Sequence, residues 1–144
     1  MKNVNLLKAM IAGIAGTVAM TIVSVYLAPM MGMPKMNPAE MLAGQMGGSM
    51  VMGWAGHFMI GIVFAIAYAF VAESLPGAPW LRGALFGIAP WLLAQAAVMP
   101  MMGMSFFSGS MVMAGGSLIG HVIYGAVVGA TYGTQASAPR TANA

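Results

Sequence analysis

Four long apolar runs constrain this chain more than any other feature of its sequence. They cover about residues 9–28, 50–72, 81–99 and 116–134. Each is long enough to cross a bilayer, because a transmembrane helix needs about 20 predominantly apolar residues. Only 5% of the 144 residues are charged, whereas soluble domains carry about 25%. The sequence therefore predicts an all-α membrane protein, a single domain of four transmembrane helices in contact with the lipid bilayer.

The second and fourth runs repeat each other. Residues 52–69 (MGWAGHFMIGIVFAIAYA) align without a gap on residues 116–133 (GSLIGHVIYGAVVGATYG). His57 thereby meets His121, at an offset of 121 − 57 = 64 residues. Each copy, read as a helix, places its histidine and the small residues that follow at four-residue spacing on one face, because such positions share a helix face.

The first and third runs also correspond, because the segment PMMGM occurs at residues 29–33 and again at 100–104. The chain is therefore predicted to be a four-helix bundle built from two parallel-repeat helical hairpins, with repeat halves of about residues 9–72 and 81–134. Each half contains two spans, an even number, so both halves are expected to have the same orientation in the membrane.

The positions of the basic residues predict the orientation, because cytoplasmic loops carry the excess of lysine and arginine. On the opposite side Lys35 is balanced by Glu40. We therefore expect a protein of the cell membrane with both termini cytoplasmic and a flexible tail at residues 135–144. Tyr68 and Tyr132, near the inner ends of their spans, are expected to be interfacial anchors. The basic residues of the cytoplasmic side are Lys2, Lys8, Arg82 and Arg140.

His57 and His121 are the only histidines of the chain, and both fall inside predicted spans. An ionisable residue within a span is a candidate functional residue. A pseudo-twofold axis between the two hairpins would bring both imidazoles toward one point, and neutral imidazole is a ligand for copper, zinc and haem iron. The pair is thus a candidate cofactor site, for a copper ion or for haem b. The alternative is that each histidine only forms a hydrogen bond to a neighbouring helix.

The chain is rich in methionine, with 18 residues of this type. Two matched clusters lie on the predicted outer side, close to the histidines. Methionine thioethers are soft ligands that select Cu(I), so these clusters are candidate metal ligands together with the histidines. The alternative is that methionine serves as a flexible apolar filler. The clusters consist of Met30, Met31, Met33, Met101, Met102 and Met104.

Several classes of activity are excluded by what the chain does not contain. It has no cysteine and no aspartate, and its two glutamates, Glu40 and Glu73, lie in predicted loops. No acid–base pair, Ser-His-Asp arrangement or carboxylate proton relay can therefore be built within the spans. The five basic residues are scattered, whereas a nucleic-acid surface needs them clustered on one face. We therefore expect neither an enzyme nor a nucleic-acid-binding protein.

Glycines at four-residue spacing, in the pattern of a glycine zipper, predict close packing of helices. The partner helix is either in the same chain or in another, so the chain is expected to form a homo-oligomer or to be a subunit of a larger membrane complex. The glycines of the last span are Gly116, Gly120, Gly125, Gly129 and Gly133.

Three functional hypotheses follow from these features. The first is a non-enzymatic accessory or assembly protein with a metal or haem site at the histidines. The second is a small oligomeric transporter or channel for a metal ion or small solute, and the third is a scaffold without a cofactor. A polar path favouring the second would be lined by Thr17, Thr21, Ser24, Gln95 and the two histidines.

The motifs Gly56-His57-x-x-x-Gly61 and Gly120-His121-x-x-x-Gly125, each followed by a tyrosine, accompany a glycine-rich first span. This pattern resembles a family of small four-span membrane proteins of bacteria and archaea whose function is unknown. The resemblance extends over most of the chain and implies a multi-pass membrane protein. It implies no activity, so any functional conclusion depends on the two histidines and their surroundings.

Overall fold

The computed structural model describes residues 4–133, which form helices and short connections without any strand. Four continuous helical stretches in this range are long and apolar enough to span a membrane, as the sequence predicted. They cover Leu6–Met30, Met50–Ser74, Pro79–Met101 and Met111–Tyr132. The tail predicted at residues 135–144 lies outside the described residues, as do Lys2 and Arg140.

Two of the spans begin earlier than predicted, at polar side chains that cap the free amides of the helix start. Helix α1 (Leu6–Ile22) begins three residues earlier than expected, because the Asn5 side chain accepts a hydrogen bond from the Lys8 amide at 2.9 Å. Helix α7 (Met111–Tyr132) begins five residues earlier than expected, after Ser110, whose hydroxyl accepts from the Met113 amide. Such N-cap residues satisfy donors that would otherwise have no partner.

Two spans contain a short π-helical segment at the same relative position. Val23–Leu27 follows α1 and leads into α2 (Ala28–Met30), and Ala94–Val98 follows α5 (Pro79–Leu93) and leads into α6 (Met99–Met101). Their offset, 94 − 23 = 71, equals that of the two PMMGM segments. Such segments are frequent at functional sites. Here they bury Ser24 and Gln95, which occupy the second position of their respective segments.

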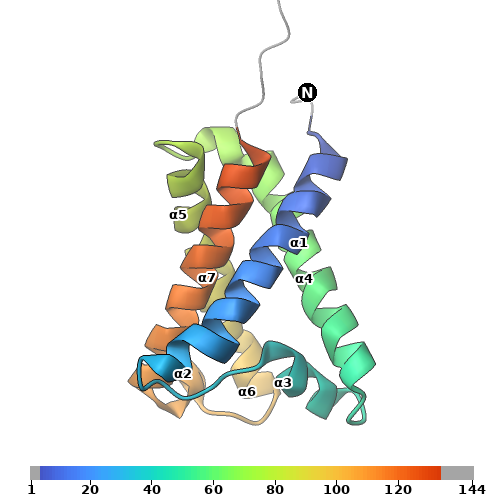
Figure 1. The fold of residues 1–144 in the computed structure, drawn as a ribbon, viewed down its shortest axis with the longest axis vertical. Helices are drawn as coiled ribbons and strands as arrows, with labels where there is room; N and C mark the ends of the chain where they lie inside the picture. Colours follow the sequence, from blue (N-terminus) through green and yellow to red (C-terminus); the bar gives the residue numbers. More distant parts are fainter. Residues whose placement is uncertain (1–3, 134–144) are drawn as a thin grey trace, which may run out of the picture.

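The four spans alternate in direction (Figure 1). Helices α1 and α5 run from the end of the bundle that carries Lys8 and Arg82, called the basic end, toward the end that carries α2 and α6, called the methionine end. Helices α4 (Met50–Val71) and α7 return, so these two histidine-bearing helices run in the same direction. A short helix, α3 (Pro38–Gln45), follows Asn37 and packs against α4 at the methionine end.

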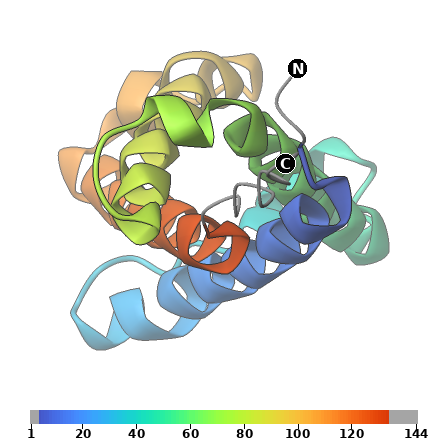
Figure 2. The same ribbon diagram turned by 90° about the horizontal axis from the view of Figure 1, so that it is seen from above.

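Seen from the basic end, the spans form a curved row in the order α4, α1, α7, α5 (Figure 2). Helix α1 packs along α4 on one side and along α7 on the other, and α7 packs along α5. Helices α4 and α5, at the two ends of the row, have little contact with each other. Three pairs of neighbouring spans are thus packed together, whereas the fourth side of the bundle, between α4 and α5, is packed only loosely.

Glycines bring α5 and α7 into backbone contact. A Cβ atom added to Gly125 would fall on the carbonyl oxygen of Gly83, and one added to Gly87 would fall on the carbonyl oxygen of His121. No side chain larger than hydrogen fits at these points, which is the packing mode of small residues in membrane helices. The predicted close packing thus occurs within the chain, and it fixes the backbone that carries His121.

A tyrosine cluster fills the bundle toward the basic end, and here the sequence prediction was wrong. Tyr68 and Tyr132, expected at the membrane interface, are buried inside the protein, with exposed fractions of 0% and 2%. Their rings pack edge to face with centroids 6.0 Å apart. The Tyr68 hydroxyl donates to the Pro79 carbonyl oxygen at 3.3 Å. Deeper in the bundle, the Tyr124 hydroxyl donates to the carbonyl oxygen of Gly61. The hydroxyls of Tyr68 and Tyr124 thus find partners inside the protein, which favours burial over an interfacial position.

Candidate functional site

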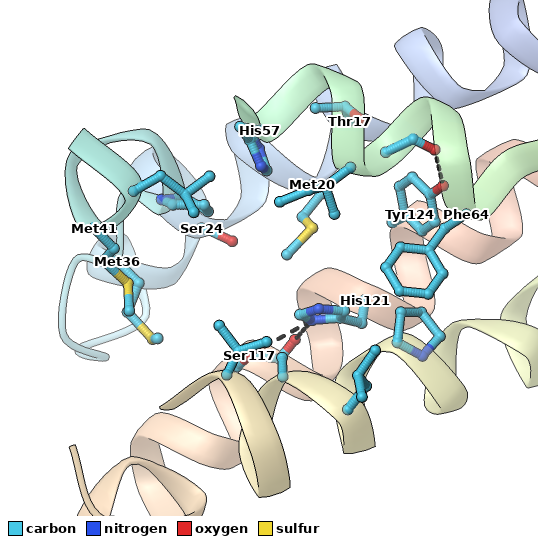
Figure 3. A pocket seen from close by; sticks show the side chains of 18 of the residues that line it. Thr17, Met20, Ser24, Met36, Met41, His57, Phe64, Ser117, His121 and Tyr124 are labelled. Atoms are coloured by element: carbon cyan, nitrogen blue, oxygen red, sulfur yellow. Dashed lines mark hydrogen bonds between the residues drawn. The ribbon is translucent and has the colours of Figure 1, made fainter. Parts of the chain in front are cut away.

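A cavity of about 160 Å³ lies between the spans on the methionine side of the tyrosine cluster. Helices α1, α4, α5 and α7 and the connection before α4 all contribute to its wall (Figure 3). Most of the lining is apolar, and no charged residue is among the described residues that form it. Its polar lining residues are Thr17, Ser24, His57, Ser117, His121 and Tyr124.

The hydrogen bonds around His57 determine which of its ring nitrogens carries the proton. The His57 Nε2 atom lies 3.1 Å from the Thr21 hydroxyl oxygen, and that hydroxyl donates to the Thr17 carbonyl oxygen at 2.8 Å. A hydroxyl has only one proton to donate, so the Thr21 oxygen must accept from His57 Nε2–H. The other nitrogen, Nδ1, therefore carries the lone pair.

His121 is held in the opposite tautomer. Its Nδ1 atom lies 2.8 Å from the Ser117 backbone carbonyl oxygen, one turn earlier in α7. Because a carbonyl oxygen can only accept, Nδ1 carries the proton and donates it. The lone pair of His121 is therefore on Nε2. Histidines that bind metals are oriented in this way, with the second ring nitrogen donating to a backbone or side-chain oxygen.

Both lone pairs are accessible. Neither His57 Nδ1 nor His121 Nε2 is hydrogen-bonded to a described residue, and no buried side-chain nitrogen or oxygen in residues 4–133 lacks a partner. These two nitrogens therefore keep some accessible surface and are not fully enclosed by protein atoms. Figure 3 shows the two imidazoles on facing walls of the cavity, with the Met20 side chain between them in that view. The sequence prediction that both histidines face one pocket is consistent with this arrangement.

The methionines near the histidines are mostly not those of the two predicted clusters. Of the clusters, Met102 alone lines the cavity. Met30, Met31 and Met101 point away from the bundle and are 83%, 73% and 84% exposed. Met104 is half-buried outside the cavity lining.

The remaining cluster residue, Met33, lies apart from the histidines. It lines a second, smaller hollow beside Gly116. Four methionines that sequence reasoning had not assigned to the site do line the cavity: Met20, Met36, Met41 and Met99.

The π-helical segment of the third span connects to His121 through buried polar groups. Gln95 is 0% exposed, and its amide nitrogen lies 3.3 Å from the Ser117 hydroxyl oxygen, to which it donates. Its amide oxygen accepts a hydrogen bond from the Ser108 hydroxyl at 2.9 Å. Ser117 in turn supplies the carbonyl that holds the His121 ring. Gln95 was expected only as part of a polar path, whereas the structure shows it supporting the residue that orients a histidine.

The donor set limits what the cavity can bind. No group of three or more His, Cys, Asp or Glu side chains gathers within residues 4–133. The described cavity lining provides two neutral imidazoles and several thioethers, without a carboxylate. Hard cations such as Mg²⁺ and Ca²⁺ require oxygen ligands, whereas imidazole and thioether together suit a soft ion.

The fold and the site define the chain as a helical protein with four helices able to span a membrane. The chain belongs to the Family of unknown function (DUF6789), which matches residues 3–143. No curated protein and no solved structure matches the chain. The family description assigns no activity, so the function is argued from the chemistry of the cavity.

Proposed function

We propose that the chain is a non-enzymatic multi-pass membrane protein that binds one Cu(I) ion between His57 and His121, as an accessory or assembly partner in copper handling. The observation that carries this proposal is that His57 and His121 line one methionine-containing cavity, each with one ring nitrogen bound to a neighbouring oxygen and the other left available. Each lone pair is fixed by a hydrogen bond on the other ring nitrogen, which is the arrangement of a metal-binding histidine.

The choice of Cu(I) follows from charge and softness. Moving an ion into an apolar site is costly, and the cost rises with its charge. A monovalent ion is therefore favoured over a divalent one in a cavity whose described lining carries no compensating carboxylate. Thioethers select Cu(I) among the biological metals, and the Met20 side chain lines the same cavity as the two histidines.

The size of the cavity argues against haem b, the other cofactor considered from the sequence. Pockets for drug-sized ligands occupy about 300–1,000 Å³, and the porphyrin ring is at least that large a ligand. The cavity measures about 160 Å³. A single ion with its ligands is compatible with this space, whereas a haem would require the spans to separate.

A duplicated hairpin explains why a single site would contain two equivalent ligands, and we infer that the chain arose in this way. The parallel directions of α4 and α7 support the inference, as does the shared offset of 71 residues between the π-helical segments and between the PMMGM segments. The duplication is no longer exact, because His57 bonds to a neighbouring helix and His121 to its own.

Binding is favoured over conduction by the packing on the basic side of the cavity. Tyr68, Tyr124 and Tyr132 fill the bundle there, and Tyr124 bonds directly to the backbone of α4. The tyrosines therefore close the cavity on the side of the basic end, as expected of a binding site and not of a channel. With the basic end on the cytoplasmic side, the ion would arrive from the outer, methionine side.

The proposal is tested by titrating the purified protein with Cu(I) against a chromophoric competitor. Wild type is expected to bind one ion per chain. The two test variants are His57→Gln and His121→Asn, because their amide groups can replace the hydrogen bonds to Thr21 and Ser117 while removing the imidazole. Loss of an outer-shell partner lowers metal affinity by roughly 10–100-fold. Each of these variants removes a direct ligand, so we expect it to lower the Cu(I) affinity by more than that.

The controls separate a ligand role from a structural one. Helix content and thermal unfolding of both variants should stay close to wild type, because the amides retain the hydrogen bonds. If wild type binds no Cu(I), or if the double variant binds it as tightly as wild type, the histidines are structural hydrogen-bonding residues and the proposal is wrong.

A further inference from the structure

The cavity has an exposed rim on one side. Ile60 on α4 is 43% exposed, and Leu93 and Val98 at the end of α5 and in the following π-helical segment are 51% and 36% exposed, although all three line the cavity. On the opposite side the lining is sealed, with Thr17 at 1% and Ser117 at 8% exposure. The cavity is therefore open between α4 and α5.

This opening reflects an asymmetry in helix packing. In a bundle of two hairpins, the contact between α1 and α7 corresponds to the contact between α5 and α4. The first extends along both helices, whereas α4 and α5 have little contact (Figure 2). They approach near the basic end, where the Tyr68 and Phe86 rings have centroids 5.4 Å apart. Toward the methionine end the rim residues stand on either side of the opening.

The opening lies at the depth of the bilayer core rather than at its surface. Ile60 is ten residues from the start of α4, which places it about 15 Å into a span at about 1.5 Å per residue. Leu93 is eight residues from Met101, the end of its span, or about 12 Å from that end. The hydrocarbon core is about 30 Å thick. In a bilayer, lipid chains and not water would therefore lie against this opening.

We propose that the opening between α4 and α5 is a lateral binding site for one acyl chain of a bilayer lipid. The end of this acyl chain enters the part of the cavity next to the opening. The cavity lining on α4, on α5 and in the following π-helical segment includes the apolar residues Phe64, Pro90 and Ala94. A space of about 160 Å³ is far larger than the roughly 10–15 Å³ that one water molecule needs. Left without contacts, its lining would lose dispersion attraction, and an acyl chain restores that attraction without burying a polar group.

The inference does not depend on Cu(I) binding. An acyl chain at the opening contacts Ile60, Leu93 and Val98, whereas the proposed ion lies deeper, between the imidazoles. The acyl chain would shield the two histidines from water, whether or not a metal ion is bound. The two proposals can therefore fail separately.

The test uses the full chain in vesicles that contain a phosphatidylcholine with a photoreactive diazirine near the end of one acyl chain. After irradiation, the modified residues are mapped by mass spectrometry. The wild-type protein is expected to carry adducts on lining residues such as Phe64 and Ala94, in addition to outward-facing residues. Absence of adducts from the lining residues would overturn the proposal.

A matched pair of variants makes the test specific. Leu93→Trp fills the opening, whereas Leu92→Trp places the same side chain on the outward surface next to it, where Leu92 is 46% exposed and does not line the cavity. The first variant should lose the adducts on the lining residues and the second should keep them. Equal labelling in the two variants would contradict the proposal.

A second design does not require the tryptophan variant to fold. The chain has no cysteine, so Leu93→Cys and Leu92→Cys can be labelled with phenylmaleimide after folding. Only the label at position 93 should abolish the inner adducts. If the Leu93→Cys protein instead forms a disulfide-linked dimer efficiently in vesicles, a second copy of the chain covers the opening, and the acyl-chain proposal is wrong.

Discussion

Replacing Gly125 by alanine should destabilise the bundle, although the same change usually stabilises a helix. An alanine Cβ at this position would fall on the Gly83 carbonyl oxygen and lie 3.0 Å from the Gly87 amide nitrogen. Both are backbone atoms, which cannot rotate away, so α5 and α7 must move apart. Overpacking of this kind costs about 1–3 kcal/mol.

The matched control is Gly115→Ala on the same helix, where an added Cβ meets nothing within 4 Å. Both changes gain about 1 kcal/mol of helix propensity, and this gain cancels in the comparison. The free energy of unfolding of Gly125→Ala should therefore lie about 1–3 kcal/mol below that of Gly115→Ala.

Equilibrium unfolding in detergent–lipid micelles measures the difference between the two variants. An equal or higher stability of Gly125→Ala would refute the backbone contact between α5 and α7. Because α5 also touches the His121 carbonyl through Gly87, the variant should weaken Cu(I) binding as well.

Two further predictions concern the surroundings of the histidines. Gln95→Leu leaves the Ser117 hydroxyl without its donor, so we expect a loss of about 1–3 kcal/mol in the free energy of unfolding. We also expect the Cu(I) affinity to fall by about 10–100-fold. An unchanged affinity would show that Gln95 only supports packing. Met20→Leu should reduce Cu(I) affinity while Met101→Leu, on an 84% exposed residue, should not; equal affinities in competition titrations would remove Met20 from the ligand set.

The spans and the shared orientation of the histidines toward a cavity could be anticipated from the sequence for simple reasons. Apolar length alone identifies spans, and residues at four-residue spacing share a helix face whatever the tertiary structure. His57, Gly61 and Ala65 therefore had to face one direction together, and the structure turns that face inward, with all three buried. The hydrogen bonds of His57 were not predictable, because Thr21 belongs to another helix.

The methionines were assigned less well, and the π-helical segments are one physical reason. Each residue of an α-helix turns the chain by about 100°, so one extra residue in a turn redirects every side chain that follows. Among the methionines that come after such segments, Met30 and Met101 point outward, whereas Met99 and Met102 line the cavity. Met20 comes before one and points into the cavity. No periodicity in the sequence marks these insertions.

The burial of the tyrosines could not be predicted from the sequence, for a different reason. Tyr68 and Tyr132 have the position expected of interfacial anchors, yet both are buried. Both rings belong to a buried cluster that contains several alanines, and the Pro79 carbonyl oxygen of a neighbouring helix accepts a hydrogen bond from the Tyr68 hydroxyl. Such a partner is supplied by the tertiary structure and not by the local sequence.

X-ray absorption spectroscopy at the copper edge tests the central claim most directly, because it identifies the atoms bound to the ion. Protein loaded with one equivalent of Cu(I) is expected to show nitrogen and sulfur in the first shell, with the outer-shell scattering typical of imidazole. That imidazole signal should disappear when His57→Gln and His121→Asn are combined. A first shell of sulfur alone, or a spectrum unchanged in the double variant, would contradict a copper site at the two histidines.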